Sequence, residues 1–190
     1  MKRIAFAVTG SFCTFSKIPP VLEALAREYE VTPIFSRVTA TLDTRFGAAA
    51  DFREKVAAIC GREPLTELTE VEPIGPRRLF EAVVVAPCTG SALSALASGS
   101  AATAVTLACK AQLRNGGPVL LAVSSNDALS GNAKNLGELL ARRGYFFVPF
   151  RQDDPEGKPT SLVADFSLIP AALAAALDGR QLQPLLLGAQ

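Results

Sequence analysis

Short apolar segments of strand length alternate along this chain with segments in which apolar residues recur at helical spacing. This alternation is typical of a parallel β-sheet covered by helices on both faces. The pattern predicts strands at residues 3–8, 31–36, 82–86, 118–124 and 145–150. It predicts helices at 19–29, 48–60, 133–143 and about 167–178, with further helical segments between 91 and 114. We therefore expect a three-layer α/β/α fold.

Turn and cap residues support several of these boundaries. Pro19 and Pro20 suit the first turn of a helix. Gly61 and Gly144 are placed to cap the C-terminal ends of two others. Residues 64–79, rich in Pro and Glu, predict a short strand followed by a long connection.

Composition and charge indicate one domain spanning residues 1–190 and exclude several kinds of partner. The chain is 49% hydrophobic and 19% charged, with 19 basic and 18 acidic side chains. This balance leaves no basic surface for nucleic acid or a membrane. The first apolar run stops at Thr9 and Gly10, which is too short for a secretory signal, and no segment reaches the length of a spanning helix. We expect a soluble, cytoplasmic protein without membrane contact.

The reactive residue types narrow the chemistry further. Cys13, Cys60, Cys88 and Cys109 form no C-x-x-C pair, which favours reduced thiols over a disulfide framework or a zinc site. The chain contains no histidine, so a Ser-His-Asp triad, a Cys-His pair and a His-ligated metal are excluded.

Four loops are candidates for ligand binding, because ligands of such sheets sit outside the carboxyl ends of the strands. All four are rich in small hydroxyl residues, and they span residues 9–11, 36–39, 87–91 and 124–127. Hydroxyls and backbone N–H groups at helix N-termini can bind a phosphate without a lysine. Neither a Walker loop nor G-x-G-x-x-G occurs, so a mononucleotide or flavin mononucleotide (FMN) fits better than ATP or NAD.

The motifs in these loops resemble those of the flavoprotein family, which includes homo-oligomeric flavin-containing cysteine decarboxylases and flavin prenyltransferases. The resemblance rests on the strand followed by Thr-Gly-Ser, on Ser36, on "APCTGSA" and on Asn126. The segments "TGSFCTF", "DTRFG", "LRNGGPVLLAVSSNDAL", "VPFRQDDP" and "GRQLQP" extend it over nearly the whole chain. They are most similar to one subunit of a two-subunit enzyme that forms pyridine-2,6-dicarboxylate.

This resemblance implies a Rossmann-like, flavodoxin-like domain that assembles into trimers or larger oligomers, with FMN between subunits. It implies an oxidoreductase subunit that converts a dihydro- or tetrahydrodipicolinate precursor in the mother cell of a spore-forming bacterium. The implied partner is a pyridine-nucleotide-dependent subunit, which would bind NAD(P). Contacts to the flavin are implied for Gly10, Ser11, Ser36, Thr39, Pro87, Thr89, Ser91 and Ser124. Asn126 is implied to lie near the isoalloxazine ring or the substrate, as a catalytic residue.

Two departures from the family pattern leave other functions open. The family's phosphate motif, Pro-x-Ser/Thr-x-Asn-Ser/Thr, reads Pro87-Cys88-Thr89-Gly90-Ser91-Ala92 here, so two polar groups are shortened or lost. This favours an alternative in which the chain is a non-catalytic structural subunit with a degenerate flavin pocket. The decarboxylases use a histidine and a Pro-x-Met-Asn segment, and both are missing here, which disfavours an FMN-dependent decarboxylase.

Two side chains have competing interpretations. Arg45 could bind a substrate carboxylate through its planar guanidinium, as a second catalytic residue, or form a salt bridge with Asp43 that shapes the loop. Cys13, near a probable helix start, is interpreted as a small packed thiol rather than a nucleophile, because no base lies beside it. Asp127 and residues 153–154 are the carboxylates available for proton transfer.

The loops at residues 9–11 and 89–91 should face one pocket, since they follow strands that are expected to be neighbours. A β-branched residue at Gly10 should then block a ligand by filling the space that its phosphate needs.

Overall fold

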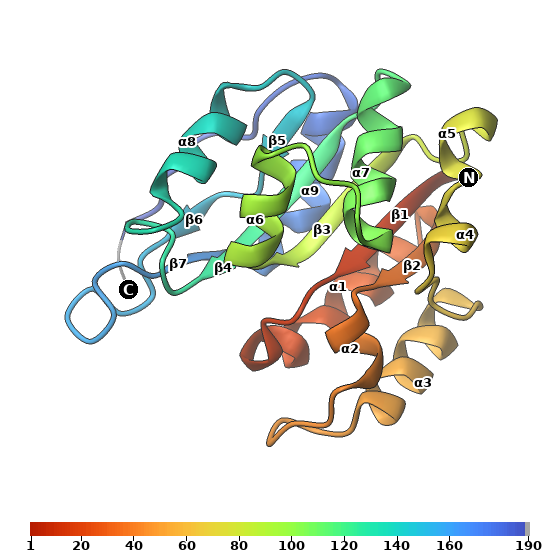
Figure 1. Cartoon of the computed structure of the whole chain (residues 1–190), viewed down its shortest axis with the longest axis horizontal. Coiled ribbons are helices and arrows are strands. Elements are labelled where there is room, and N and C mark those ends of the chain that lie inside the picture. The colour runs from red at the N-terminus through yellow and green to blue at the C-terminus, as the bar shows by residue number, and fades with distance from the viewer. Residues whose placement is uncertain (189–190) are drawn as a thin grey trace.

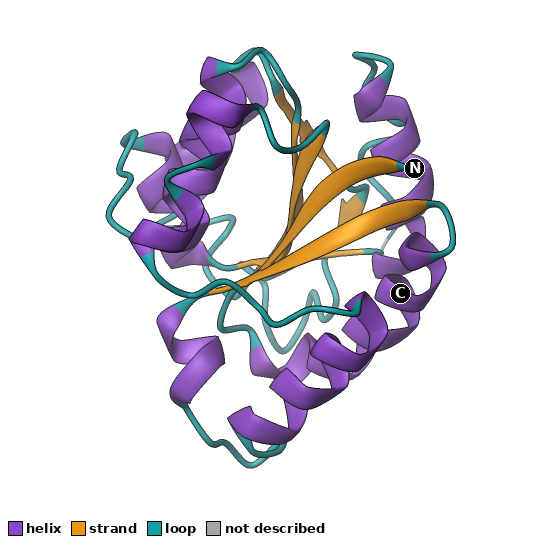
Figure 2. Ribbon diagram, turned by 90° about the vertical axis from the view of Figure 1, so that its right-hand side faces the viewer, coloured by secondary structure: helices purple, strands orange, loops and turns teal. Residues whose placement is uncertain are grey.

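The computed structural model describes residues 1–188 and contains one central sheet between two layers of helices (Figures 1 and 2). The strand order is β2-β1-β3-β4-β7-β6, and β5 also pairs with β4. The strands are β1 (Lys2–Val8), β2 (Tyr29–Phe35), β3 (Ala82–Cys88), β4 (Val119–Ser125), β5 (Tyr145–Phe147), β6 (Phe150–Arg151) and β7 (Leu162–Ala164). Strands β1 to β5 pair in parallel, whereas β7 runs antiparallel to β4 and β6.

The helices cover both faces of the sheet. The α-helices are α1 (Ile18–Ala26), α2 (Arg37–Thr41), α3 (Ala49–Cys60), α4 (Leu68–Val71), α5 (Ile74–Arg77), α6 (Gly90–Ala97), α7 (Ala104–Arg114), α8 (Ala133–Ala141) and α9 (Ile169–Leu177), with 3₁₀ helices at Phe12–Lys17 and Phe166–Leu168. Helix α1 packs against α3 and α9 on one face, and α6 packs against α7 and α8 on the other. Within residues 1–188, no helix combines the length and apolar composition needed to span a bilayer.

The core lies along the two central strands. Every residue of β3 and β4 is buried, including the three consecutive valines Val83, Val84 and Val85. A strand covered by helices on both faces must be apolar on both faces, which explains why these segments show no alternation. The expected α/β/α fold with a mostly parallel sheet is confirmed.

Several boundaries differ from those that the sequence predicts. Tyr29 begins β2 instead of ending the first helix, because α1 stops at Ala26 and Tyr29 pairs with Lys2 of β1. Helix α8 ends at Ala141, so Gly144 is no helix cap: its φ of 87° forms the turn into β5. Gly61 does cap α3 in the left-handed conformation, as expected.

The other differences concern strands. Residues 64–79 form α4 and α5 instead of a strand, and the one β-bridge that they make to the sheet within the described chain joins Leu65 to Ile34. Strand β5 ends at Phe147, two residues before Pro149, which has no N–H to continue the ladder. The hairpin of β6 and β7 follows, and the sequence pattern did not predict it.

Candidate functional site

The loops after β1 and β3 are in direct contact. The Thr9 hydroxyl donates to the backbone oxygen of Pro87 at 2.7 Å and lies 3.3 Å from the Thr89 hydroxyl. The Thr89 N–H donates back to the Thr9 hydroxyl at 3.2 Å. The two loops meet as expected, because β1 and β3 are neighbours and their carboxyl ends lie at the same edge.

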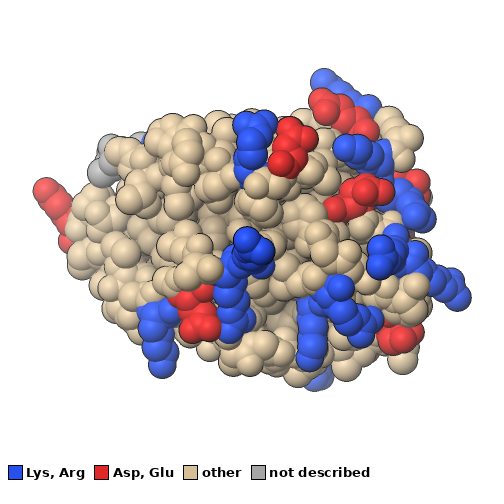
Figure 3. Space-filling model, turned by 90° about the horizontal axis from the view of Figure 1, so that it is seen from above, with Lys and Arg blue, Asp and Glu red and all other residues tan. Residues whose placement is uncertain are grey.

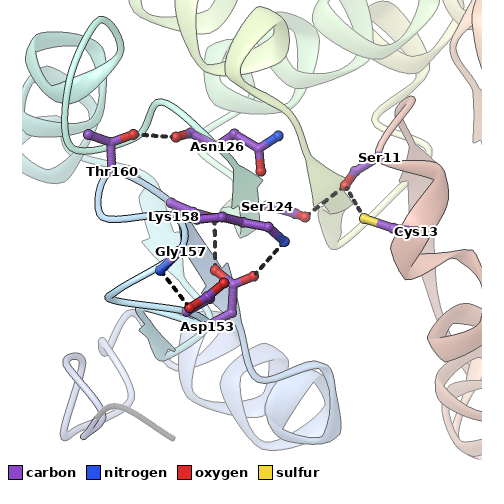
Figure 4. Close-up of polar contacts among 10 residues, drawn as sticks. Ser11, Cys13, Ser124, Asn126, Asp153, Gly157, Lys158 and Thr160 are labelled. Carbon is purple, nitrogen blue, oxygen red and sulfur yellow. Dashed lines mark hydrogen bonds and ion pairs between the residues drawn. The ribbon is translucent and has the colours of Figure 1, made fainter.

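A second contact reaches across β3 to the end of β4. The hydroxyls of Ser11 and Ser124 form a hydrogen bond of 2.8 Å, although the two residues are 113 positions apart (Figure 4). Cys13 lies beside this pair, with its sulfur 3.7 Å from the Ser11 oxygen. The thiol is exposed, so the expectation that Cys13 is a packed thiol is wrong. The 3₁₀ helix after β1 holds this residue at the surface.

The loop after β2 is joined by a hydrogen bond to the end of β1. Ser36 caps α2, and its hydroxyl is 2.9 Å from that of Thr39. Thr39 is only 1% exposed and donates its hydroxyl to the backbone oxygen of Val8 at 3.1 Å. Thr39 therefore ties α2 to the end of β1, and Ser36 is the more accessible of the two hydroxyls.

The third loop starts helix α6 at the same edge. Pro87 follows a cis peptide bond and is buried at the end of β3. Thr89 caps α6 by accepting the Ala92 N–H at 3.3 Å, and Ser91 is exposed in the first turn. The polar groups of this loop thus lie around a helix N-terminus, whose free N–H groups and dipole favour anions.

A carboxylate lies against the start of α6. Asp127 accepts hydrogen bonds from the Ser125 hydroxyl at 2.6 Å and from the Asn132 amide at 2.8 Å. A Cβ atom on Gly90 would come within 2.8 Å of polar atoms of all three residues, so the backbone of α6 packs directly on this cluster. The hydrogen bond from Ser125, followed by that from Asn132, lowers the pKa of Asp127 below its ordinary value. The carboxylate is thus a weak base that stays ionised at neutral pH.

Acid should weaken this cluster. A lowered pKa in the folded state means that the carboxylate stabilises the fold above its ordinary pKa and loses this effect as the pH falls through the lowered value. We expect Asp127→Asn to cost about 1 kcal/mol of unfolding free energy at pH 7. The difference should shrink as the pH falls below about 4. Urea denaturation between these pH values measures it. Glu23→Gln on the exposed side of α1 is the control, and an equal loss at both pH values would contradict the prediction.

Asn126 stands between the strand-end site and the loop that joins β6 to β7. The Thr160 hydroxyl donates to the backbone oxygen of Asn126 at 2.6 Å, and Figure 4 shows the Asn126 amide directed away from Thr160. In the same loop Lys158 pairs with Asp153 at 3.7 Å, and Asp153 also accepts the Ser161 hydroxyl. The sequence pattern does not predict that residues 152–161 border the site beside Asn126. No local signal shows that this segment folds back onto β4.

Arg45 lies apart from the other candidate residues. It is exposed on the loop between α2 and α3, which extends away from the sheet in Figure 1, and its guanidinium lies 4.9 Å from the centre of the Phe46 ring. Of the two interpretations of Arg45, the salt bridge with Asp43 is not formed: Asp43 instead accepts the N–H of Ala49 at 2.9 Å, at the start of α3. Within residues 1–188 the Arg45 guanidinium forms no ion pair, which leaves it accessible to an anion.

Gly10 is crowded by protein. A Cβ atom at this position would lie 2.8 Å from a methyl carbon of Val38 on α2. A β-branched side chain at Gly10 would therefore displace α2 first, and any effect on a ligand would follow from that shift.

The buried cysteines are not in the ionised form that reacts. Burial raises the pKa of the Cys88 thiol, which is 0% exposed, so this residue is part of the core rather than of a pocket lining. Burial also raises the pKa of Cys109 to about 12 and that of Cys60 to about 11. Cys109 is buried in the core, whereas Cys60, at the end of α3, is only partly buried.

Comparisons with known proteins agree with the fold. Residues 1–166 match the sequence model of the family described as Flavoprotein. The chain is 41% identical to the B subunit of dipicolinate synthase from Bacillus subtilis, over 97% of this chain and 93% of that protein.

Solved structures show the same similarity. The crystal structure of the B subunit of dipicolinate synthase from Bacillus halodurans superposes with a TM-score of 0.91 at 37% identity, covering 100% of this chain and 97% of that one. The FMN-dependent cysteine decarboxylase SpaF shares the fold, with a TM-score of 0.69 at 21% identity over 94% of this chain and 96% of its own. The predicted similarity is confirmed, and the chain belongs to the Flavoprotein family.

Proposed function

We propose that this chain is the flavin-binding B subunit of a dipicolinate synthase. With a pyridine-nucleotide-dependent A subunit, it would form pyridine-2,6-dicarboxylate from a dihydro- or tetrahydrodipicolinate precursor. Two hydrogen-bonded pairs of hydroxyls carry the proposal, Thr9 with Thr89 and Ser11 with Ser124, in a chain 41% identical to the B subunit of dipicolinate synthase.

The polar groups at this edge fit FMN. Ser11, Thr89 and Ser91 offer hydroxyls around the N-terminus of α6, where a phosphate or the ribityl chain is favoured. Gly10 and Pro87 shape the backbone of the first and third loops, and the remaining candidate donors follow on either side: Ser36, Thr39 and Ser124. When bound, the flavin would supply hydride transfer.

Asn126 and Arg45 would act on the substrate. The Asn126 amide could donate to a substrate carboxylate or to the flavin ring, because its backbone is held by Thr160. Arg45 would bind a second carboxylate at the mouth of the site. We propose that NAD(P) binds to the A subunit, that the present chain assembles into trimers or larger oligomers with flavin between the copies, and that both proteins act in the cytoplasm of the mother cell.

One observation favours the alternative of a structural subunit without catalysis. The Asp127 carboxylate lies beside Gly90 at the start of α6, where its charge opposes that of a phosphate. Ala92, which replaces a polar residue of the family motif, removes a further hydroxyl from this helix turn. A flavin decarboxylase is disfavoured because the chain has no histidine.

Titration with FMN separates these functions. We expect the purified chain, on its own or in complex with the A subunit, to bind FMN and to shift its absorbance bands. Ser11→Ala removes the hydroxyl that pairs with Ser124, so the affinity for FMN should fall about three- to tenfold, the effect of one hydrogen bond. Ser98→Ala, at the other end of α6, is the control.

Two results would count against the proposal. Turnover by the two-subunit enzyme without any bound flavin would support the structural alternative. Equal FMN affinity of the Ser11→Ala and Ser98→Ala variants would place the cofactor away from the ends of β1 and β4.

A further inference from the structure

A cavity opens at the amino ends of the parallel strands, opposite the edge at which the candidate ligand loops lie. It has a volume of about 260 Å³ and is lined by the C-terminal end of α6 and the loop after it, by one side of α7, by the residues that follow α8 and by the start of β5. Tyr145, the first residue of β5, lies in its wall. The flavin loops follow the carboxyl ends of the strands, so this cavity belongs to a different part of the molecule.

Three cations line the cavity: Lys110 of α7, and Arg142 and Arg143 after α8. Arg142 is fixed, since it donates to the backbone oxygens of Leu96 and Ala97 at 3.2 and 2.7 Å and pairs with Glu138. Lys110 and Arg143 form no ion pair with any residue between 1 and 188. The Arg142–Glu138 pair cancels, which leaves two uncompensated positive charges at the cavity.

The location of these charges is partly explained by the helix dipole. Cations near the C-terminal end of a helix stabilise it, which accounts for Arg142 and Arg143 after α8. The dipole does not require the cations of two helices to meet around one hollow, with hydroxyls of Ser100 and Thr106 in its lining. The ends of α7 and α8 lie at the top of Figure 1, and Figure 3 shows Lys and Arg side chains spread across the middle of this face.

The remaining wall is apolar. Leu96 and Leu113 form part of the lining together with the ring of Tyr145. A bare inorganic anion would leave this apolar surface in contact with water, whereas a carbon skeleton would cover it. The volume of about 260 Å³ lies just below the range of about 300–1,000 Å³ for drug-sized ligands, so the cavity suits a single ring and is too small for a nucleotide.

From these observations we infer that the cavity between α6, α7, α8 and β5 binds a small dicarboxylate whose carbon skeleton is a single ring. Its two carboxylates would pair with Lys110 and Arg143, and its ring would lie between Leu96, Leu113 and Tyr145. Arg142 positions the wall by joining the end of α8 to the last carbonyls of α6. Flavin plays no part in this binding, so the inference goes beyond the proposed function.

Isothermal titration calorimetry on the whole chain tests this site. The probes are benzene-1,3-dicarboxylate, benzoate and inorganic phosphate, each added with excess FMN present so that any flavin site is filled. We expect saturable binding of the dicarboxylate, about tenfold weaker binding of benzoate, and no binding of phosphate in the same range. Arg143→Gln and Lys110→Gln should each weaken the dicarboxylate about tenfold, and Lys134→Gln, an exposed residue of α8 outside the cavity, should not.

Several outcomes would overturn the inference. Absence of saturable binding at millimolar dicarboxylate would do so, as would equal affinities of the Arg143→Gln and Lys134→Gln variants. Phosphate that binds as well as the dicarboxylate would remove the role of the apolar wall. Loss of affinity for the A subunit in the two cavity variants, without any dicarboxylate binding, would assign the cations to a protein interface. All variants are exposed substitutions, and their melting curves check that the fold is retained.

Discussion

Replacing Gly90 with valine is expected to lower the melting temperature. It is also expected to lower the affinity for FMN more than the loss of any single hydroxyl does. The new Cβ atom would lie 2.7 Å from the Asn132 amide nitrogen and from an oxygen of Asp127, and 2.8 Å from the Ser125 hydroxyl. These atoms are held in place by their own hydrogen bonds, so they cannot move aside without losing them. Such overpacking costs about 1–3 kcal/mol, which corresponds to about 2–10 °C in a chain of this length.

The same substitution should displace the first turn of α6. Thr89 and Ser91 flank Gly90, so we expect FMN affinity to fall more than tenfold in an absorbance titration. Gly137→Ala is the matched control: its Cβ would meet nothing within 4 Å, and alanine is favoured over glycine in a helix such as α8. A Gly90→Val variant that melts and binds FMN like the parent would show that α6 does not need this close approach.

The second large effect is expected at Arg45. Arg45→Ala should lower kcat/KM of the two-subunit enzyme about ten- to a hundredfold, because a desolvated carboxylate would lose a charged, bidentate partner. The kcat/KM of Arg45→Lys should lie between those of the parent and Arg45→Ala, because lysine keeps the charge and lacks the planar guanidinium. The side chain is exposed and contacts the Phe46 ring, so folding and flavin content should be preserved.

Steady-state kinetics of the complex measures this effect, with Arg27→Ala, directly after α1, as control. If Arg45 binds the substrate, the fall in kcat/KM should come mainly from a higher KM. If Arg45→Ala unfolds the chain, or turns over as fast as the parent, Arg45 shapes its loop through Phe46. The substrate carboxylates would then be bound elsewhere, for example by the pyridine-nucleotide-dependent protein of the complex.

The sequence predicts the central strands well because their burial leaves a direct signal. Val83 to Val85 are apolar on both faces, and only a strand between two helical layers requires this. The Thr9 and Thr89 contact follows from the same logic, since parallel neighbours end at one edge. Fold and strand-end loops are therefore accessible from local pattern and topology alone.

The missed parts depend on contacts between distant residues. Nothing near Thr160 in the sequence shows that its hydroxyl reaches the backbone of Asn126, because the hairpin of β6 and β7 is short and irregular. A salt bridge between Asp43 and Arg45 was one of two interpretations of this loop, but Asp43 accepts a hydrogen bond from the N–H of Ala49, which is unpaired within α3 because it lies at the start of the helix. Whether the Asp43 carboxylate binds the Arg45 guanidinium or the N–H at the start of α3 depends on the path of the backbone, which the sequence pattern does not predict.

The antiparallel pairing of β7 with the end of β4 has a consequence for how the protein is made. Asn126 emerges from the ribosome well before Thr160 and Ala164, which complete its surroundings. At about 5–20 residues per second, the interval lasts roughly 2–8 s. During this time the nascent chain carries the first three candidate ligand loops without Thr160 and β7 on the far side of β4. A ligand that meets the chain at this stage would find an open edge, so we expect stable binding only after β7 has been made.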